Sequence, residues 1–407
     1  MKNNILVIGL GYVGLPLAIN LSKYYKVIGF DKSIKRIIEL KKGKDRNEEV
    51  SKNEILKSKI KFSFDEKELN SKIDTFIITV PTPVNAKKKP DIRNLISACK
   101  LISKKIKKNN LIIIESTIAP GTTEDVCLDL ISKKSKVNRR DLNICFSPER
   151  INPGDKINNL KNLVKIISGN SKKSINSAFK IYKKVSKKVV LADSIKAAEL
   201  AKIVENAQRD LNISFMNELY KICDLYKLNY KHVLSLCKTK WNFVDFQPGL
   251  VGGHCVPVDP YYLIESIKKK GFKSEVLSLS RKVNENFVDY ISNKILKFLK
   301  PIKKKKIFFY GINFKDNVLD RRNSKFYLIY KNLEKIYKKK LTLGDDINDG
   351  KAIDFRKYNV LITGSKNSKT YKIIKRFKKN NNSKKIIINI FGHLSLTSNK
   401  KLRIINI

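Results

Sequence analysis

The feature of this sequence that most constrains its fold is a glycine-rich turn near the start of the chain. Residues 5–8 are a short apolar run typical of a β-strand, residues 9–14 read GLGYVG, and residues 15–21 have a helical pattern. A second strand-like run ends in Asp31, about 20 residues after the turn, which is the spacing of a dinucleotide-binding fingerprint. This order of strand, turn, helix and acid predicts a Rossmann-type domain.

The glycines and the acid have separate expected roles. Gly9 is expected to make the tight turn, Gly11 to let a pyrophosphate approach the backbone at the helix N-terminus, and Gly14 to permit close helix–strand packing. Asp31 is expected to bind a ribose 2′-hydroxyl and to repel a 2′-phosphate, which favours NAD over NADP. Arg36 lies nearby and works against that preference.

Further apolar runs alternate with helical segments and end in polar residues. The strand candidates are residues 73–80, 111–114, 144–146, 164–168 and 189–191. Thr82 follows the first run, Thr117 the second, and Glu149 and Arg150 the third. In a doubly wound sheet such C-terminal strand ends face the ligand crevice, although each segment alone is more often an ordinary turn.

Residues 194–225 predict a long helix. Its apolar stripe consists of Leu200, Val204, Ala207, Leu211, Phe215 and Ile222. Lys202 and Asn206 share another face, which Arg209 extends, and an ordinary solvated face is the alternative interpretation. A long, mostly apolar helix between two α/β regions is also suited to a homodimer interface.

The chain after this helix predicts a second, smaller α/β domain. Residues 276–299 have a helical pattern, and the later strand candidates are residues 306–310, 360–364 and 385–390. We therefore expect two Rossmann-like doubly wound α/β domains joined by a long central helix, with boundaries at 1–192, 193–300 and 301–407.

A loop between the two helices carries a thiol. Residues 252–260 read GGHCVPVDP, so two glycines precede Cys255 and a carboxylate, Asp259, follows four residues later. The glycines allow close approach of a ligand, and the prolines stiffen the loop. A lone cysteine is more often buried packing than a nucleophile, so this stretch by itself leaves both interpretations open.

Charge raises a non-enzyme alternative. The chain has 86 Lys and Arg against 37 Asp and Glu, a formal net charge of +49. A basic nucleic-acid-binding protein on a Rossmann scaffold would bind phosphates by counterion release. The lysines are spread along the chain without a basic arm, however, and codon bias toward Lys, Asn and Ile explains them more simply. We expect no nucleic-acid partner, although such a surface attracts anionic substrates.

Cysteine usage and the N-terminus bear on location. The six cysteines are scattered without a CxxC pair, which favours reduced thiols and a cytoplasmic location. The first apolar run is followed by glycines where a signal-peptide cleavage site would lie, and no run approaches the ~20 residues of a membrane helix. We expect neither a membrane segment nor a metal site.

Several longer segments together resemble one family. They are GLGYVGLPLA (9–18), ESTIAPGTTE (115–124), SPERINPGD (147–155), AELAKIVENAQRDLNISFMNEL (198–219), TKWNFVDFQPGLVGGHCVPVDPYYL (239–263) and GINFKDNVLDRRNS (311–324). In this order they resemble the nucleotide-sugar 6-dehydrogenases of the UDP-glucose/GDP-mannose dehydrogenase family. The subgroup most similar to them is the bacterial UDP-N-acetylglucosamine/UDP-N-acetylgalactosamine 6-dehydrogenases of capsule and O-antigen synthesis.

The resemblance implies an NAD-dependent oxidoreductase that acts on CH–OH and converts a C6 alcohol into a carboxylate in a four-electron oxidation. It implies that Cys255 is the nucleophile that carries a thiohemiacetal and then a thioester, and that Lys202 stabilises oxyanion charge. It places Asn206 and Asp259 with Lys202 and the catalytic water. Glu149 and Thr117 are implied near the water and the sugar.

The resemblance also implies two sets of binding residues. The cofactor contacts are Gly9, Gly11, Tyr12, Val13, Gly14, Asp31, Arg36, Thr82, Thr117 and Arg322, with Asp31 and Arg36 as the adenosine-ribose pair. The substrate contacts are Glu149, Arg150, Lys202, Asn206, Phe246, Gly249, Gly252 and Lys315. A UDP-sugar substrate and a homodimer formed through the central helix are implied as partners.

The sequence departs from the family pattern in places. Pro153 stands where UDP-glucose dehydrogenases usually have a second glutamate, and residues 248–250 lack their arginine. Both departures favour an N-acetylhexosamine over UDP-glucose, and UDP-glucose or GDP-mannose remain the alternative substrates. Asn323 replaces a common glutamate, and the side chain of His254 is expected to point away from the site. A catalytically silent homologue is disfavoured because Cys255, Lys202, Asn206 and Asp259 are all present.

Overall fold

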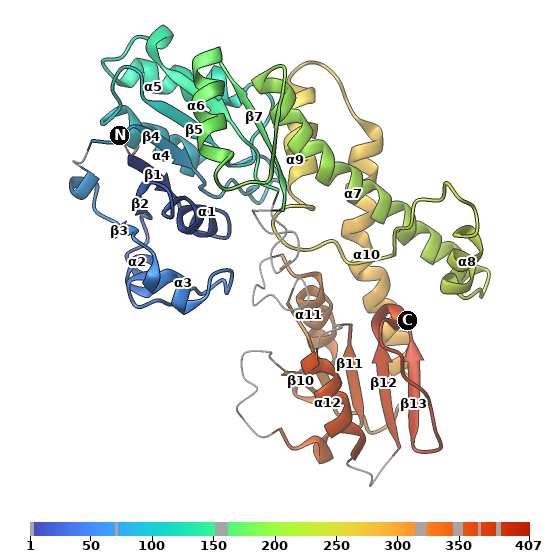
Figure 1. Ribbon diagram of the computed structural model, residues 1–407. Helices are drawn as coiled ribbons and strands as arrows, with labels where there is room; N and C mark the ends of the chain where they lie inside the picture. Colours follow the sequence, from blue (N-terminus) through green and yellow to red (C-terminus); the bar gives the residue numbers. More distant parts are fainter. Residues whose placement is uncertain are drawn as a thin grey trace. The chain divides into compact units, whose positions relative to one another are not determined.

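The computed structural model describes residues 4–69, 72–150, 162–313, 323–344, 353–364, 368–379 and 384–407 (Figure 1). Within these ranges the chain forms two compact units. The first runs to Ala207 and includes Val258–Lys273, and the second takes Gln208–Pro257 and the chain from Ser274 onward. The division runs through one long helix, whereas the sequence-based division sets that helix apart. The three-domain boundaries stay a prediction.

The first unit is built on an eight-stranded sheet. Its strands are β1 Asn4–Ile8, β2 Lys26–Phe30, β3 Lys61–Ser63, β4 Thr75–Ile78, β5 Leu111–Ile114, β6 Asn143–Phe146, β7 Val164–Gly169 and β8 Lys188–Leu191. Their order is β3-β2-β1-β4-β5-β6-β7-β8. All neighbours pair in parallel except β6 and β7. The strand order reverses between β1 and β4, which is where a doubly wound sheet binds its ligand.

Helices cover both faces of this sheet. They are α1 Gly14–Leu21, α2 Ile34–Lys41, α3 Lys52–Lys57, α4 Arg93–Ser103, the π-helical η2 Thr122–Leu128, α5 Asp129–Lys134, α6 Lys172–Tyr182 and α9 Asp259–Lys268, with short 3₁₀ turns η1 Glu66–Leu69 and η3 Arg139–Asp141. Alternate residues of a strand point to opposite faces. Ile5 and Val7 therefore join the core formed with α1, α2 and α6, while Leu6 and Ile8 join the core formed with α4 and α5.

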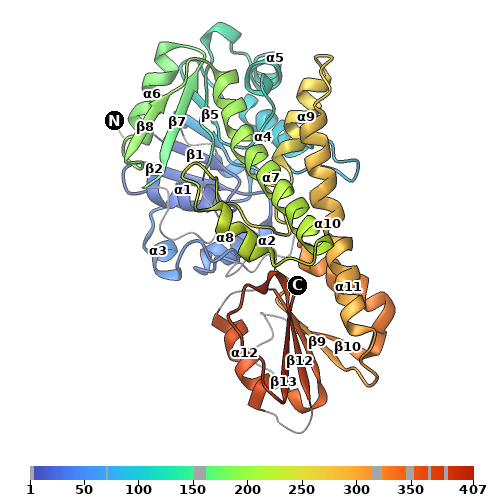
Figure 2. The same ribbon diagram turned by 90° about the vertical axis from the view of Figure 1, so that its right-hand side faces the viewer.

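The second unit contains a five-stranded parallel sheet in the order β10-β9-β11-β12-β13. Its strands are β9 Ile307–Tyr310, β10 Leu341–Gly344, β11 Val360–Thr363, β12 Lys385–Asn389 and β13 Leu402–Asn406. Its helices are α8 Tyr230–Cys237, α10 Glu275–Leu299, α11 Lys325–Tyr337 and α12 Ser368–Lys379, with short turns η4 Lys338–Lys340, η5 Phe355–Lys357 and η6 Ile390–Gly392. Helices α10 and α11 pack in one core and α12 in the other, on opposite faces of the sheet (Figure 2).

The predicted α/β class and the long central helix are confirmed. Helix α7 spans Ile195–Leu225, 31 residues, close to the predicted 194–225. Its apolar stripe is only partly buried: Ala207 is buried, but Leu200, Val204, Phe215 and Ile222 are exposed, Phe215 to 59%. Most of the apolar stripe of α7 is therefore not packed against other residues in the described part of this chain.

Three strands of the structure have no counterpart in the sequence-based prediction, namely β3, β10 and β13. Each lies at an edge of its sheet or beside one, and β3 has only three residues. Edge strands are short and need no continuous apolar run, so their sequence signal is weak. Among the helices that the structure describes, none is long and apolar enough to cross a membrane.

Candidate active site

The glycine turn after β1 has three distinct local environments. Gly9 has φ +93°, and a Cβ there would lie 3.0 Å from the Thr79 carbonyl oxygen. A Cβ on Gly14 would lie 1.8 Å from the Gly9 carbonyl oxygen and 2.3 Å from Thr79 Oγ1. A Cβ on Gly11 would meet no atom within 4 Å. Close contacts with neighbouring atoms of the protein thus require glycine at positions 9 and 14, while Gly11 borders open space.

The first turn of α1 suits an anion. No side chain caps its N-terminus, where Val13 is the capping residue, and Tyr12 and Val13 are half-buried beside the open space at Gly11. Backbone N–H groups at a helix N-terminus attract phosphate. These features fit the pyrophosphate of NAD, as the sequence predicts.

The acid at the end of β2 holds the glycine turn in place. Asp31 accepts hydrogen bonds from the backbone N–H groups of Leu10 (2.9 Å) and Ser33 (2.9 Å). Arg36 donates from Nε to the Leu10 carbonyl (2.8 Å), and its Nη1 lies 2.8 Å from Asp45 Oδ1. The Arg36–Asp45 pair is buried, so Arg36 stabilises the glycine turn from within the protein interior. Contacts of Asp31 and Arg36 with a ribose stay predictions.

Two predicted cofactor residues meet at the carboxyl ends of β4 and β5. Thr82 Oγ1 donates to the Thr117 carbonyl at 2.6 Å. Tyr262, on α9, donates from its hydroxyl to the Thr82 carbonyl at 2.9 Å, and it is fully buried. The sequence analysis missed Tyr262, because an aromatic residue in a helical pattern gives no sign of such a bond. Thr82 and Thr117 thus lie on one edge of the sheet.

A buried group of charges lies beside this edge. Because β7 runs antiparallel to β6, its first residues lie at the carboxyl end of β6. Lys165 Nζ lies 2.7 Å from Glu115 Oε2 and 3.2 Å from Glu149 Oε2, and the Tyr182 hydroxyl donates to Glu115. Glu149, predicted to act near the catalytic water, is therefore oriented by a buried lysine. Lys165 was missed, although a lysine inside the apolar run VKIIS is a usable signal.

Burial dominates the electrostatics of this group. It raises the pKa of Glu115 to about 7, against the lowering effect of Lys165. Burial alone would lower the pKa of Lys165. The nearby carboxylates of Glu115 and Glu149 have a larger, opposite effect, so the pKa of Lys165 is raised. The lysine therefore remains a cation beside Glu149.

Three predicted catalytic residues come together where α7 meets the start of α9. Asn206 Nδ2 donates to Asp259 Oδ2 at 2.6 Å, and Lys202 Nζ lies 3.6 Å from the same oxygen. All three side chains are buried, Asp259 to 2% exposure. Burial raises the pKa of Asp259, and the Lys202 charge opposes that shift. A lysine held in this way can place positive charge at a developing oxyanion.

Neighbouring residues of α7 extend this region. Arg150 Nη2 lies 2.7 Å from Glu205 Oε1, and its Nη1 donates to the Val164 carbonyl at 3.3 Å. Glu199 accepts from the backbone N–H groups of Gly121 (2.5 Å) and Thr123 (2.8 Å), and burial raises its pKa to about 7. Glu199, which the sequence analysis missed, fixes the loop between Thr117 and the π-helical turn η2.

The nucleophile candidate lies in the second unit. Cys255 is half-buried in the loop that precedes α9, and His254 Nδ1 lies 3.3 Å from Cys255 Sγ. The His254 side chain therefore contacts the sulfur of its neighbour, while the expectation that it points away from the site stays a prediction. The two glycines that precede His254 let this irregular loop bend, with Gly253 at φ +87°, so the side chains of His254 and Cys255 are not held on opposite sides as in a strand.

The remaining predicted substrate residues of the loop, Phe246, Gly249 and Gly252, are half-buried. Lys315, Arg322 and Pro153 lie outside the described residues, and their predicted roles stay predictions. No group of three or more His, Cys, Asp or Glu side chains in the described part of the chain is arranged to hold a metal ion.

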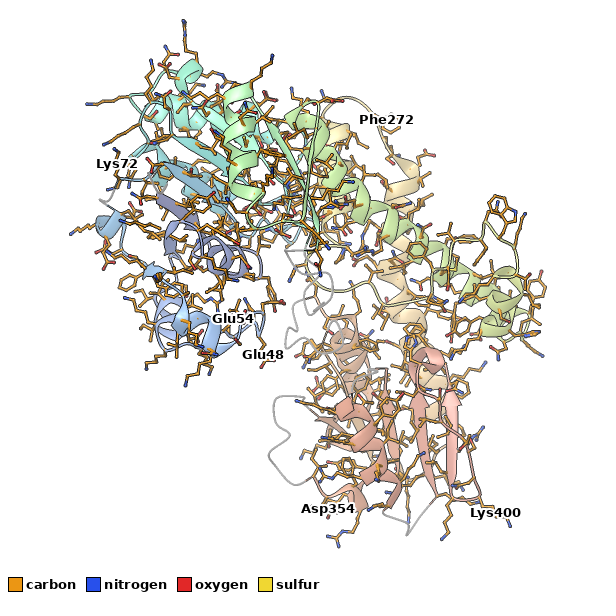
Figure 3. The ribbon with its side chains drawn as sticks, in the orientation of Figure 1. Glu48, Glu54, Lys72, Phe272, Asp354 and Lys400 are labelled. Carbon is orange, nitrogen blue, oxygen red and sulfur yellow. The ribbon has the colours of Figure 1, made fainter. Side chains whose placement is uncertain are left out.

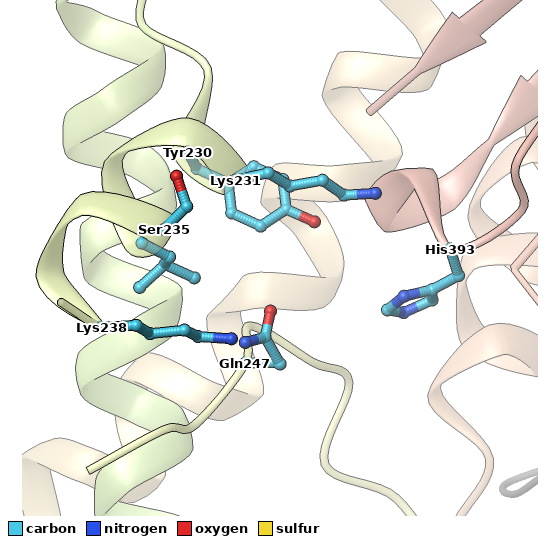
Figure 4. A pocket seen from close by; sticks show the side chains of 7 residues that line it. Tyr230, Lys231, Ser235, Lys238, Gln247 and His393 are labelled. Carbon is cyan, nitrogen blue, oxygen red and sulfur yellow. The ribbon is translucent and has the colours of Figure 1, made fainter. Parts of the chain in front are cut away.

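A separate cavity of about 390 Å³ in the second unit contains none of the predicted catalytic residues (Figure 4). It is lined by Tyr230, Lys231, Leu234, Ser235, Lys238, Gln247 and His393. Lys231 reaches from α8 toward η6 and donates to the Gly392 carbonyl, while Lys238 pairs with Asp245 at 2.7 Å. Basic side chains also project from both units at large, for instance Lys72 and Lys400 (Figure 3), so this cavity is not distinguished by its charge.

Comparison with known proteins yields matches along most of the chain. Residues 3–186 match the family model described as "UDP-glucose/GDP-mannose dehydrogenase family, NAD binding domain", and residues 196–286 match the central domain of the same family. Protein CapL of Staphylococcus aureus is 40% identical over 86% of this chain and 84% of its own length.

Two further relatives have names that specify a sugar. A UDP-N-acetyl-D-glucosamine 6-dehydrogenase of Salmonella typhi is 38% identical over 91% of this chain and 88% of its own. The solved structure of the UDP-N-acetyl-mannosamine dehydrogenase Cap5O from Staphylococcus aureus superposes with a TM-score of 0.85 at 28% identity, covering 99% of this chain and 98% of that one.

The two glycine environments predict different outcomes for two alanine variants. Gly14→Ala should lower the thermal midpoint and abolish NAD binding, because its Cβ would overlap the Gly9 carbonyl. Gly11→Ala should fold as the wild type does, yet weaken NAD binding by at least about tenfold by filling the space next to the helix N-terminus. Thermal unfolding and NAD titration measure both. Wild-type NAD affinity in Gly11→Ala would contradict this placement of the pyrophosphate.

Glu199 predicts a pH dependence of stability. Between its ordinary pKa of 4.5 and its folded value of about 7, the folded state keeps a proton that the unfolded state releases. The free energy of unfolding should therefore fall as pH rises through this window, by up to about 3 kcal/mol from this group. Glu199→Gln, which resembles the neutral acid, should show a smaller fall in urea unfolding between pH 4 and 8. Parallel curves for the two proteins would refute the assignment.

Proposed function

Because the chain belongs to the UDP-glucose/GDP-mannose dehydrogenase family, and is thus an NAD-binding oxidoreductase, we propose that it oxidises the C6 hydroxyl of a UDP-N-acetylhexosamine to the carboxylate. The observation that carries the chemistry is the buried contact of Asp259 with Asn206 and Lys202. A buried carboxylate that keeps a lysine and an amide in one place is suited to an oxyanion intermediate. The choice of sugar rests on relatives named for N-acetylhexosamines.

The residues expected to bind NAD belong to the first unit. Gly11 and the first turn of α1 would take the pyrophosphate, Asp31 the adenosine ribose, and Thr82 and Thr117 would border the nicotinamide half. When bound, NAD accepts a hydride in each of the two oxidations. Asp31, at the end of β2, would repel the extra phosphate of NADP.

In the proposed mechanism the first oxidation removes a hydride and a proton from the C6 alcohol and leaves an aldehyde. The Cys255 thiolate adds to this aldehyde and forms a thiohemiacetal, and the second oxidation converts the thiohemiacetal into a thioester. Water then attacks the thioester carbonyl, the C–S bond breaks, and the thiolate and the carboxylate are released. Lys202 would stabilise the oxyanion at each addition, and Asp259 would balance the lysine's charge. Glu149, held by Lys165, would lie near the attacking water.

The proposed setting follows from the same relatives. Oxidised UDP-N-acetylhexosamines are building blocks for surface polysaccharide such as capsule or O-antigen, and a cytoplasmic enzyme would supply them. We also propose a homodimer in which a second copy covers the exposed apolar stripe of α7, since exposed patches of this kind mark interaction surfaces.

The substrate prediction is a ranking. UDP-N-acetylglucosamine or its galacto epimer should be preferred over UDP-glucose by at least about tenfold in kcat/KM, because Pro153 removes a charged side chain from the segment expected to line the sugar. Each sugar acid should appear with two NADH. The assay follows NADH absorbance with these three sugars, UDP-N-acetylmannosamine and GDP-mannose at fixed NAD. Preference for UDP-glucose would overturn the subgroup, and absence of NADH with every sugar would overturn the function.

The nucleophile prediction uses a second cysteine as its control. Cys255→Ala should abolish formation of the sugar acid while NAD affinity stays at the wild-type value, because the glycine turn belongs to the other unit. Cys237→Ala, which removes another half-buried thiol from the second unit, should leave turnover unchanged. Product analysis by mass spectrometry distinguishes acid from aldehyde. Normal acid formation by Cys255→Ala would exclude the covalent mechanism.

A further inference from the structure

The loop that carries Cys255 has almost no regular structure of its own. Between the end of α8 at Cys237 and the start of α9 at Asp259 no helix or strand is formed. Such a segment holds its shape only where other elements bind its backbone. Two asparagine side chains of the second unit do so, at Gly249 and at Gly253.

Asn217, on α7, binds both polar groups of one loop residue. The Gly249 N–H donates to Asn217 Oδ1 at 2.8 Å, and Asn217 Nδ2 donates to the Gly249 carbonyl at 3.0 Å. Asn217 is fully buried. A primary amide offers a donor and an acceptor side by side, so it can bind the N–H and the C=O of one residue at the same time.

The orientation of the Asn217 amide is itself determined by a buried network. Asn217 Nδ2 also donates to Asn284 Oδ1 at 2.8 Å, and Asn284 Nδ2 donates to Asp210 Oδ1 at 2.7 Å. The Asp210 carboxylate, paired with Arg281, can only accept. Asn284 must therefore point its NH₂ group toward Asp210, and Asn217 must point its NH₂ group toward Asn284 Oδ1. The Asn217 Oδ1 atom is then left to accept from the Gly249 N–H.

Asn323 forms the second anchor. It binds the loop at Gly253, which precedes Cys255 by two residues. Asn323 Nδ2 donates to the Gly253 carbonyl at 3.0 Å. Asn323 has φ +53°, a left-handed conformation that asparagine tolerates better than most residues. The glutamate common at this position in the family could not donate to a carbonyl when ionised. The departure from the family pattern is thus the group that makes this bond.

Both anchors lead back to α10. Lys325, two residues after Asn323, lies 3.3 Å from Glu285, and Glu285 pairs with Arg281, the partner of Asp210. The buried pair of Asp210 and Arg281 therefore supports the anchor at Gly249, and the Lys325–Glu285 pair connects the segment that follows Asn323 to the same helix. Gly249 belongs to the predicted sugar-binding segment, whereas Gly253 adjoins the predicted nucleophile.

We propose that Asn217 and Asn323 are positioning residues of this enzyme, with Asn217 setting the substrate-binding part of the Cys255 loop and Asn323 setting the thiol. The inference rests on the proposed function for its kinetic consequences, and on the structure alone for the anchoring. The two residues act on different parts of the loop, so their loss changes different kinetic constants.

The test compares steady-state kinetics of full-length variants on the preferred nucleotide sugar. Asn217→Ser removes two hydrogen bonds to Gly249 and raises KM on the order of tenfold with a smaller change in kcat. Asn323→Asp keeps the size and tolerates the left-handed backbone but places an acceptor against the Gly253 carbonyl, and it lowers kcat about fivefold with KM changed less than about twofold. Asn109→Asp, another asparagine at positive φ, φ +71°, in an exposed loop of the first unit, is the matched control and leaves both constants unchanged.

Hydrogen–deuterium exchange supplies a readout that needs no substrate. The backbone amides of residues 249–256 exchange faster in Asn217→Ser and Asn323→Asp than in wild type or Asn109→Asp, while amides in the strands of both sheets stay protected. Should Asn217→Ser not fold, Asn323→Asp alone decides the matter. Faster exchange with unchanged kcat and KM overturns the positioning role, and unchanged exchange overturns the anchors. If wild type oxidises no sugar, the proposed function fails, and exchange alone then decides whether the anchors exist.

Discussion

Strands of a parallel sheet that is covered by helices on both faces have no solvent-facing side for polar residues, and the rest of this structure follows from that constraint. The central strands β4, β5 and β6 are buried along their whole length. Apart from Thr75 and Asn143, which begin β4 and β6, the polar side chains here lie in the segments just beyond the carboxyl ends, as Thr82, Glu115, Thr117 and Glu149 do. Parallel strands bring these ends to one edge, so the fold gathers the chemistry without any long-range signal in the sequence.

Two buried groups beside the sheet edge pair a lysine with carboxylates, because an unpaired buried charge costs much free energy. Lys165 lies between Glu115 and Glu149, and Lys202 lies beside Asp259. In each group burial shifts the carboxyl pKa upward and a lysine opposes the shift. Such balanced groups keep fixed dipoles in place before a substrate binds, which is the physical basis of electrostatic stabilisation.

Regular secondary structure does not supply the geometry of the Cys255 loop, and the side-chain amides of one buried and one exposed asparagine bind its backbone instead. Asn217 binds Gly249 through both the donor and the acceptor of its side chain, while Asn323 reaches the Gly253 carbonyl. A buried amide network stabilises a structure only when each of its polar groups has a hydrogen-bond partner. The irregular loop and the helical layer of the second unit are thus one structural unit.

The Rossmann fold of the first unit, the α/β class, the long helix and the family could all be predicted from the amino-acid sequence, because they depend on local periodicity, glycine spacing and the order of motifs. The sequence also placed Lys202, Asn206 and Asp259 in one group through their resemblance to the family. The short edge strands, the bond from Tyr262 to Thr82 and the pairing of Lys165 were decided only by the tertiary structure. Tyr262 and Thr82 are 180 positions apart in the chain, and Lys165 is 50 positions from Glu115 and 16 from Glu149. Residue type and periodicity carry no information about which groups will meet over such separations or at sheet edges.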